Sequence, residues 1–262
     1  MCDTRYYYFF IRLTKAVLSA LENVLKATFL YLNFIQMKLT NLLLMGSILF
    51  LMSSCNQAAE QEPEADPLAG LTPYKAGMIQ HSVADFAIWK EAYMAHDSVR
   101  SAYGLTQISL GRGMDDPNQV MVLSRIEDLQ KAKDFIAMPE LKTVMDSAGV
   151  TSMPVFTFMN VIRSDSSESP TNDRVLISHK VKDFDAWFKV YSAEGRTARA
   201  GYGLVERGMG RDLDDPNLIY IVFAVTDKEK ANARMASEEL KTMMTEAGVE
   251  GPPSIVYYTI GN

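Results

Sequence analysis

The sequence predicts an α+β fold built from two tandem βαββαβ repeats. Three observations predict it: a long internal repeat, strand-type and helix-type patterns in the same order within each copy, and strands that are apolar on both faces. With 262 residues, 48% of them hydrophobic and 22% charged, the chain has an ordinary globular composition and room for two modest domains.

The repeat is carried by many residue types at two closely similar offsets. One segment recurs 98 residues later and the segments after it recur 99 residues later, so one residue is inserted near Gly195. The copies predict a first repeat at residues 75–163 and a second at 174–262, joined by the polar linker 164–173. Matched residues include His81, Asp85, Phe86, Trp89, Tyr93, Arg100 and Asp115-Asp116-Pro117-Asn118 in the first copy, and His179, Asp183, Phe184, Trp187, Tyr191, Arg199 and Asp214-Asp215-Pro216-Asn217 in the second.

Each copy is expected to run strand, helix, strand, turn, strand, helix, strand. In the second copy, residues 175–181 alternate apolar and polar as a strand does, and an aromatic stripe follows at helical spacing. Residues 228–246 predict one further helix, which ends before Gly248. The two Asp-Asp-Pro-Asn segments predict hairpin turns, because proline presets φ and Asp and Asn side chains bond the local backbone.

Two strands of the second copy, at residues 218–225 and 255–260, are apolar on both faces. In an antiparallel sheet this requires cover on both sides. Helices cover one side, and we expect the sheet of the other repeat to cover the second.

Residues 37–54 have the pattern of an export signal. A lysine precedes an apolar run from Leu42 to Met52, too short for the roughly 20 apolar residues of a spanning helix, and small residues then precede Cys55. The segment resembles a bacterial lipoprotein signal, which implies cleavage before Cys55 and lipidation of that cysteine; an uncleaved anchor with an incidental cysteine is the alternative. The resemblance predicts a protein anchored in the cell envelope, with the outer membrane favoured by Asn56. Residues 1–36 are then an upstream extension, untranslated or part of the signal, and residues 55–74 are an acidic tether.

Charge and residue usage exclude several classes of function. Residues 1–55 hold five of the 26 Lys and Arg and two of the 32 Asp and Glu, so the remainder carries about −9. An acidic body without a cationic stripe argues against nucleic-acid binding. Two cysteines outside the repeats and three dispersed histidines, His81, His96 and His179, predict no disulfide framework and no metal site. The sequence has no P-loop and no dinucleotide glycine fingerprint, and no cofactor is predicted.

Three motifs give the repeats a family resemblance: H-x-V-x-D-F-x-x-W from His81 to Trp89, D-D-P-N from Asp115 to Asn118, and E-L-K-x-x-M-x-x-A-G-V from Glu140 to Val150. With the repeated α+β pattern, they resemble the dimeric α+β barrel superfamily, in particular its antibiotic-biosynthesis-monooxygenase-like and cyclase-like members. The resemblance implies two ferredoxin-like units packed sheet to sheet. Because members are usually homodimers of one unit, it implies here an intramolecular barrel in a monomeric chain.

His81 and His179 are the candidate catalytic residues. Each lies on the more apolar face of its predicted strand, where a histidine binds a ligand carboxylate or acts as a general acid or base. A hydrogen-bonded core histidine explains the same pattern, because no acid, nucleophile or metal partner is fixed beside it in the sequence. Haem binding through the same histidines is a weaker alternative.

Candidate ligand-binding residues lie on the helix that follows each histidine. Its aromatic residues either line a pocket that stacks a planar ligand or simply belong to the hydrophobic core. Its arginines either pair with an anionic ligand or interact favourably with the helix C-terminus. The paired aspartates supply too few oxygens for calcium, so turn formation explains them better. These ligand candidates are Trp89, Tyr93, Arg100, Trp187, Tyr191 and Arg199.

The sequence therefore predicts an envelope lipoprotein whose duplicated barrel binds a small apolar or aromatic molecule or serves as an interaction module. The alternative is a cofactor-independent monooxygenase, cyclase or isomerase acting on a planar apolar substrate. In that alternative, His81 or His179 carries the proton.

Overall fold

The structure, a computed structural model, describes residues 72–261, and both repeats contain the same order of elements. In the first repeat these are β1 Tyr74–Ser82, α2 Phe86–Ala95, α3 Asp97–Ala102, β2 Leu105–Gly113, β3 Gln119–Ile126, α4 Leu129–Ile136, α5 Pro139–Ser147 and β4 Val155–Ser164. In the second they are β5 Asp173–Val181, α6 Phe184–Glu194, α7 Arg196–Gly201, β6 Leu204–Asp212, β7 Leu218–Val225, α8 Lys228–Ala236, α9 Glu238–Glu246 and β8 Val249–Ile260.

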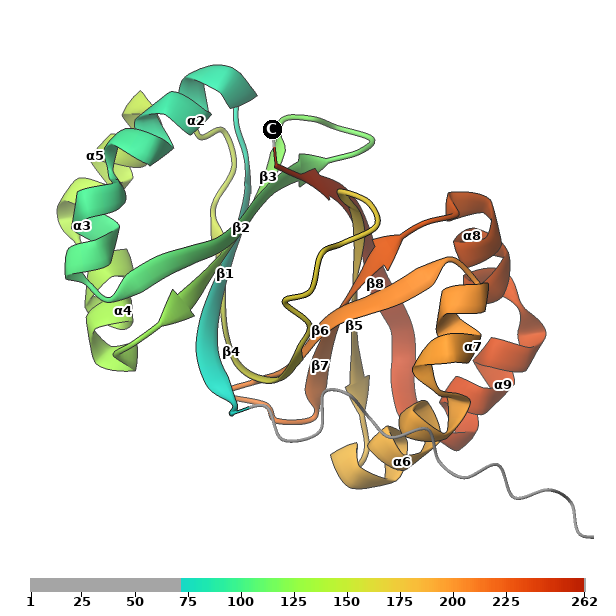
Figure 1. Ribbon diagram of the computed structural model, residues 1–262. Coiled ribbons are helices and arrows are strands. Elements are labelled where there is room, and N and C mark those ends of the chain that lie inside the picture. Colours follow the sequence, from blue (N-terminus) through green and yellow to red (C-terminus); the bar gives the residue numbers. More distant parts are fainter. Residues whose placement is uncertain (1–71, 262) are drawn as a thin grey trace, which may run out of the picture. The chain divides into compact units, whose positions relative to one another are not determined.

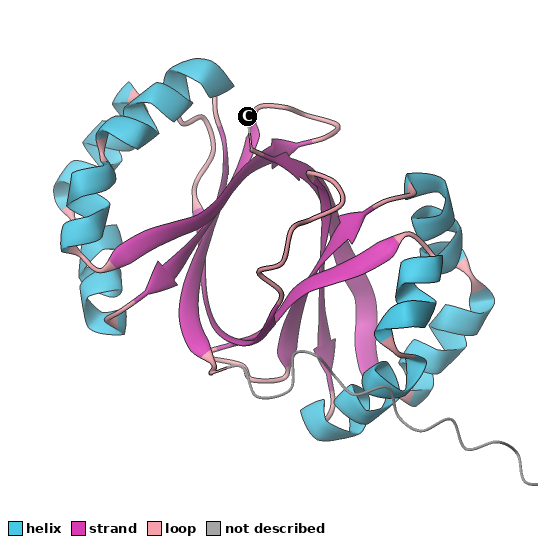
Figure 2. Cartoon of the chain, in the orientation of Figure 1, coloured by secondary structure: helices cyan, strands magenta, loops and turns pink. Residues whose placement is uncertain are grey.

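The eight strands form one closed antiparallel barrel in the order β1-β3-β2-β8-β5-β7-β6-β4. Within each repeat, the first strand lies between the third and the fourth. The repeats join at two seams, where β2 pairs with β8 and β4 pairs with β6. Figure 2 shows the strands as a ring with helices on two opposite outer sides. The predicted α+β class with antiparallel strands is confirmed.

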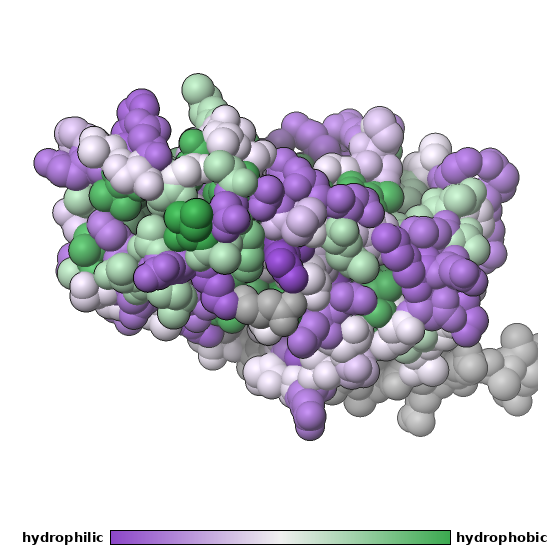
Figure 3. Space-filling view, turned by 90° about the horizontal axis from the view of Figure 1, so that it is seen from above, coloured by the Kyte–Doolittle hydropathy of each residue, from purple (hydrophilic) through white to green (hydrophobic). Residues whose placement is uncertain are grey.

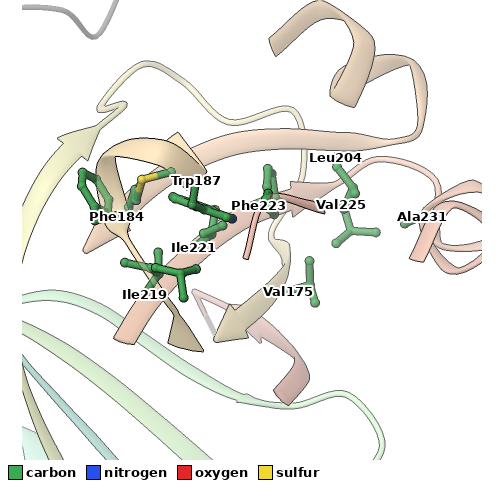
Figure 4. Packing of buried hydrophobic residues seen from close by; sticks show 12 residues of the cluster. Val175, Phe184, Trp187, Leu204, Ile219, Ile221, Phe223, Val225 and Ala231 are labelled. Carbon is green, nitrogen blue, oxygen red and sulfur yellow. The ribbon is translucent and has the colours of Figure 1, made fainter. Parts of the chain in front are cut away.

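The outer face of the barrel wall packs against helices. In the second repeat, Trp187 of α6 lies near Ile221 of β7, and Ala231 of α8 lies beside Val225 at the other end of the same cluster (Figure 4). In the first repeat, Trp89 of α2 has the corresponding place. Full burial of one such large apolar side chain contributes about 1.5–3 kcal/mol, so this contact fixes each helical layer on its sheet.

The inner face of the wall is shared by both repeats. Its buried residues come from strands alone and include no helix residue, which places them inside the barrel. Barrel closure therefore covers the second apolar face of the strands. These buried residues are Ala76, Met78, Met121, Met159, Val161, Leu176, Tyr220 and Tyr258.

Each predicted helix is in fact two helices. Residues 228–246 form α8 and α9, because Ser237 leaves the helical region and its Oγ caps α9 by accepting from the Leu240 amide at 3.2 Å. The helix after β5 ends at Gly195, whose φ of +79° lies outside the helical region. The prediction that Arg100 and Arg199 lie near the end of the aromatic helix is therefore wrong. They lie on the short helices α3 and α7 that follow it.

Two smaller predictions also need correction. The connection between repeats is residues 165–172, one residue shorter at each end than the predicted linker, and it crosses the mouth of the barrel (Figure 1). The prediction that residues 255–260 are covered on both faces is wrong for the first of them, because Ile255 is 41% exposed.

Figure 3 shows strongly apolar side chains among hydrophilic ones over the first repeat. On α2, Ile88 and Met94 are 64% and 50% exposed and flank the inward-facing Trp89. Among residues 72–261, no helix is long and apolar enough to cross a membrane. The predicted signal at residues 37–54 and Cys55 lie outside the described residues.

Candidate ligand site between helices and sheet

The second repeat brings four of the predicted residues to one pocket of about 110 Å³: His179, Trp187, Tyr191 and Arg199. His179 stands on β5, the two aromatic residues on α6 and the arginine on α7. The start of α6 is fixed by Asp183, whose carboxylate accepts from the Ala186 amide at 2.7 Å. This cap sets the register that places the aromatic stripe over the histidine.

His179 is 6% exposed, and neither ring nitrogen has a hydrogen-bond partner among the described residues. Its ring meets Trp187 edge to face, with centroids 5.3 Å apart, and Trp187 stacks on Tyr191 at 5.1 Å. Burial lowers the pKa of His179 to about 4, so the ring is neutral at pH 7. A neutral imidazole offers one N–H donor and one acceptor, and here both are unused.

The first repeat has the same arrangement around a smaller pocket of about 60 Å³. His81 is 4% exposed, and both of its nitrogens also lack a partner among the described residues. Its ring lies 5.3 Å from Trp89, which stacks on Tyr93 at 5.0 Å. Burial lowers the pKa of His81 to about 4 as well. The histidine, tryptophan and tyrosine thus keep one geometry in both copies.

Arg100 and Arg199 are occupied by protein groups. Each guanidinium lies over the tyrosine of its own repeat, 3.6 Å from the Tyr93 centroid and 3.9 Å from that of Tyr191. Each also donates to the carbonyl of that tyrosine. These contacts tie the short helices to the aromatic helices, which explains the arginines without an anionic ligand.

A charged network centred on Glu206 of the second repeat contacts two residues that line the pocket, Tyr191 and Arg199. Glu206 is 1% exposed and accepts from Arg163 at 2.6 Å, from Arg199 at 3.2 Å and from the Tyr191 hydroxyl at 2.8 Å. Burial, followed by the Glu206 charge, raises the pKa of Tyr191 well above its usual value. The tyrosine therefore stays protonated and donates to Glu206.

A second ion pair borders the same pocket. Glu194 accepts from Arg234 at 2.8 Å, and Arg234 also lies 3.2 Å from Glu239. At the matching place the first pocket is bordered by His96 and Phe135. The two pockets therefore share their histidine and aromatic residues but differ in charge.

The Asp-Asp-Pro-Asn segments form hairpin turns, as predicted. Asp116 and Asp215 each accept from the amide two residues on, at 3.0 and 3.2 Å. Lys180 neutralises Asp215 at 2.7 Å. Within residues 72–261, no three His, Cys, Asp or Glu side chains are grouped as a metal site.

Haem does not fit either histidine pocket. Sites for cofactors of that size have volumes of roughly 300–1,000 Å³, whereas these pockets measure about 60 and 110 Å³. The histidine rings are packed against tryptophan, which leaves no space for a macrocycle beside the nitrogens.

No family model matches the chain, and no curated protein matches it. Among solved structures, it is similar to an anthrone oxidase-like protein, with a TM-score of 0.51 and 12% identity, over 72% of this chain and 92% of that one. It is also similar to a ferredoxin fold protein related to antibiotic biosynthesis monooxygenases from Listeria monocytogenes, with a TM-score of 0.43 and 11% identity, over 73% and 96%. The heme-degrading enzyme LmHde from Listeria monocytogenes has a TM-score of 0.40 and 10% identity, over 71% and 99%. The first likeness shows a shared fold, and at these identities none shows an activity.

Sequence reasoning missed Glu206, Arg163, Glu194 and Arg234. It selected residues that both copies share, and these residues are not shared. The useful signal is the difference between copies: Gln107, His96 and Phe135 of the first are replaced by Glu206, Glu194 and Arg234 in the second. Glu194 and Arg234 are gained together in the second copy and pair with each other, whereas Glu206 pairs with Arg199 of its own copy and with Arg163 of the first.

Proposed function

We propose that the protein is a binding protein for a small molecule and that the ligand occupies the pocket at His179. The observation that carries this proposal is His179 itself: both of its ring nitrogens are buried without a partner among the described residues, and its side chain lines an open volume of about 110 Å³. A buried polar group without a partner costs about 1–3 kcal/mol. A ligand that supplies the missing hydrogen bonds removes this cost, which gives the pocket its selectivity.

The pocket limits the size and the polarity of the ligand. An enclosed cavity of about 150 Å³ holds one benzene molecule, so the pocket of about 110 Å³ accepts a single ring at most. Met235 and Met244 border it and adapt to small differences in shape. A neutral histidine and stacked aromatics favour an uncharged ring or short chain bearing one hydroxyl or carbonyl.

The wider context of this proposal is a lipid-anchored, fused barrel. The lipoprotein pattern before Cys55 supports a tether to the envelope, most simply the outer membrane. The matched order of elements and the two seams support a duplicated ferredoxin-like unit in which one chain supplies both halves of a dimeric α+β barrel. Such a chain needs no second copy to close its sheet, so it functions as a monomer.

The enzyme alternative is a cofactor-independent oxygenase, and the likeness to an anthrone oxidase-like protein favours it at the level of fold. Two features of the site favour binding instead. The pocket is too small for a three-ring substrate such as anthrone. His179, with a pKa of about 4, is a weak proton acceptor at neutral pH.

Phenol and toluene test the pocket, because they have nearly the same shape and only phenol offers a hydroxyl to His179. We expect calorimetry on residues 72–262 to show phenol binding about tenfold tighter than toluene, the worth of one hydrogen bond. His179→Leu removes this preference, whereas His81→Leu, in the smaller pocket of the first repeat, keeps it. Equal affinity for the two probes in the wild-type protein contradicts the proposal.

Lipidation is tested separately by the mass of the full chain expressed in a bacterium. We expect a product that begins at Cys55 and carries the added mass of acyl chains, in the membrane fraction. Cys55→Ser should yield an unacylated precursor of higher peptide mass. A wild-type product that still contains residues 37–54 rules out this processing.

A further inference from the structure

The inside of the barrel contains a cavity of about 350 Å³. It lies on the opposite face of the wall from the histidine pockets and is lined by both repeats. Most of its lining is apolar, but one end, near the linker at residues 165–172, carries cationic and hydroxyl groups. The apolar part includes Met78, Met121, Leu176 and Val222, and the polar end includes Arg174 and Tyr258.

Arg174 is a buried cation, 5% exposed, that forms no ion pair with a described carboxylate. Its Nη1 donates to the carbonyls of Thr171 at 2.5 Å and Asp173 at 2.9 Å. Its Nε and Nη2 donate to no described residue, and the side chain lines the cavity. Burial lowers the pKa of Arg174, which reflects the cost of a charge left without a counterion.

Tyr258 stands directly opposite Arg174 in the β5–β8 ladder. It is 5% exposed, and its hydroxyl makes no hydrogen bond within the described part of the chain. Burial raises the pKa of this hydroxyl, so it is protonated and able to donate. The cavity is thus lined by Arg174, whose Nε and Nη2 have no acceptor among the described residues, and by Tyr258, whose hydroxyl has none either.

The sister repeat shows that the fold does not require these two groups. The residues equivalent to Arg174 and Tyr258 are Ala76 and Met159, which are also cross-strand partners and also face the barrel interior. An apolar pair therefore closes this part of the wall equally well. The arginine and the tyrosine distinguish the second repeat at one matched position of the barrel.

The rest of the polar end adds positive charge. Arg207 replaces Ile108 of the first repeat and donates to the Asp165 carbonyl at 2.7 Å. Asp165 is the carboxylate among the described lining residues, and it already accepts from Arg196 at 2.7 Å. The negative charge present is therefore engaged, and the end of the cavity remains cationic.

We propose that the barrel interior is a second ligand site, specific for a monocarboxylate with an apolar body. The carboxylate accepts from Arg174 and from the Tyr258 hydroxyl, a charge-assisted contact of the kind that guanidinium groups favour. The apolar body lies among the methionines and aliphatic residues of both repeats. The volume of about 350 Å³ is more than twice the roughly 150 Å³ that holds benzene. A medium-length alkyl chain or a fused two-ring system therefore fits.

Octanoate and octanamide test this site, because they share length and shape and differ in charge. For the full chain at pH 7.5, we expect calorimetry to give an octanoate Kd about tenfold lower than that of octanamide. Arg174→Ala copies the first repeat and should make the two affinities equal. Tyr258→Phe retains the ring and should weaken octanoate about threefold.

Lys180→Ala serves as the matched control, because it removes one exposed positive charge outside the cavity lining and should leave octanoate affinity unchanged. Circular dichroism verifies that each variant is folded. If Arg174→Ala does not fold, Tyr258→Phe still tests the proposal. Any one of three results would overturn the proposal. The wild-type protein binds the two probes equally, both cavity variants bind octanoate as tightly as the wild type, or octanoate does not bind below about 10 mM.

Discussion

Acidification from pH 6.5 to pH 4 is expected to remove several kcal/mol of folding stability through His81 and His179 alone. In the folded chain the pKa of each histidine is lowered to about 4 by burial, while in the unfolded chain it is about 6.5. Between these values the unfolded state binds the proton and the folded state does not, so stability falls as the pH falls. The loss amounts to about 3 kcal/mol per histidine at pH 4 and is absent above pH 7.

Urea unfolding of residues 72–262 at half-unit steps from pH 7.5 to pH 4 measures this loss. His179→Leu and His81→Leu should each remove about half of the histidine-linked decrease, and the double variant should remove nearly all of it. At pH 7.5 each variant should be as stable as the wild type or more so, because it deletes two unpartnered polar atoms. A pH dependence that is the same in the wild type and the double variant means that these rings are not buried and neutral.

Glu206→Ala is expected to destabilise the protein by about 3–5 kcal/mol. The carboxylate is 1% exposed and binds Arg163, Arg199 and the Tyr191 hydroxyl. Without it, the guanidinium groups of both arginines lose the buried carboxylate that they share, and Arg199 keeps Glu194 at 3.4 Å. Removing one partner of a buried pair leaves its full desolvation cost uncompensated.

The first repeat provides the control for this prediction. Gln107 occupies the place equivalent to Glu206 and is exposed, so Gln107→Ala should change the free energy of unfolding by less than about 0.5 kcal/mol. Glu206→Gln, which keeps the shape, should cost less than Glu206→Ala because it can still accept from the tyrosine. A cost below about 1 kcal/mol for Glu206→Ala would show that solvent reaches the network.

Periodicity and the internal repeat predicted the strands and the hairpin turns, because these depend on local patterns. The division of each helix was not predicted, although Ser237 followed by Glu238 and Glu239, and Pro139 after Met138, are start signals for a new helix. The apolar pattern continues through both breaks. Apolar periodicity alone therefore does not reveal a residue whose backbone leaves the helical region and which caps the next helix.

The candidate site was predicted in part for a different reason. His179, Trp187 and Tyr191 recur with His81, Trp89 and Tyr93, so comparison of the copies identified them and the structure brings them together. Glu206 and Arg174 are replaced by Gln107 and Ala76 in the first repeat, so comparison for shared residues did not select them. Their meaning depends on which face of the barrel wall they occupy and on which strands lie beside them, which the closed strand order decides.

Native mass spectrometry of the protein purified from its native cells tests the central claim most directly. The wild-type protein should carry one small, uncharged adduct of single-ring size, and His179→Leu purified in the same way should lack it. A larger carboxylate adduct that is lost in Arg174→Ala is assigned to the barrel interior. Its loss in that variant distinguishes it from the small adduct of the His179 pocket. A wild-type protein without a small adduct in repeated preparations, or one whose adduct persists in His179→Leu, would contradict the assignment of the ligand to the His179 pocket.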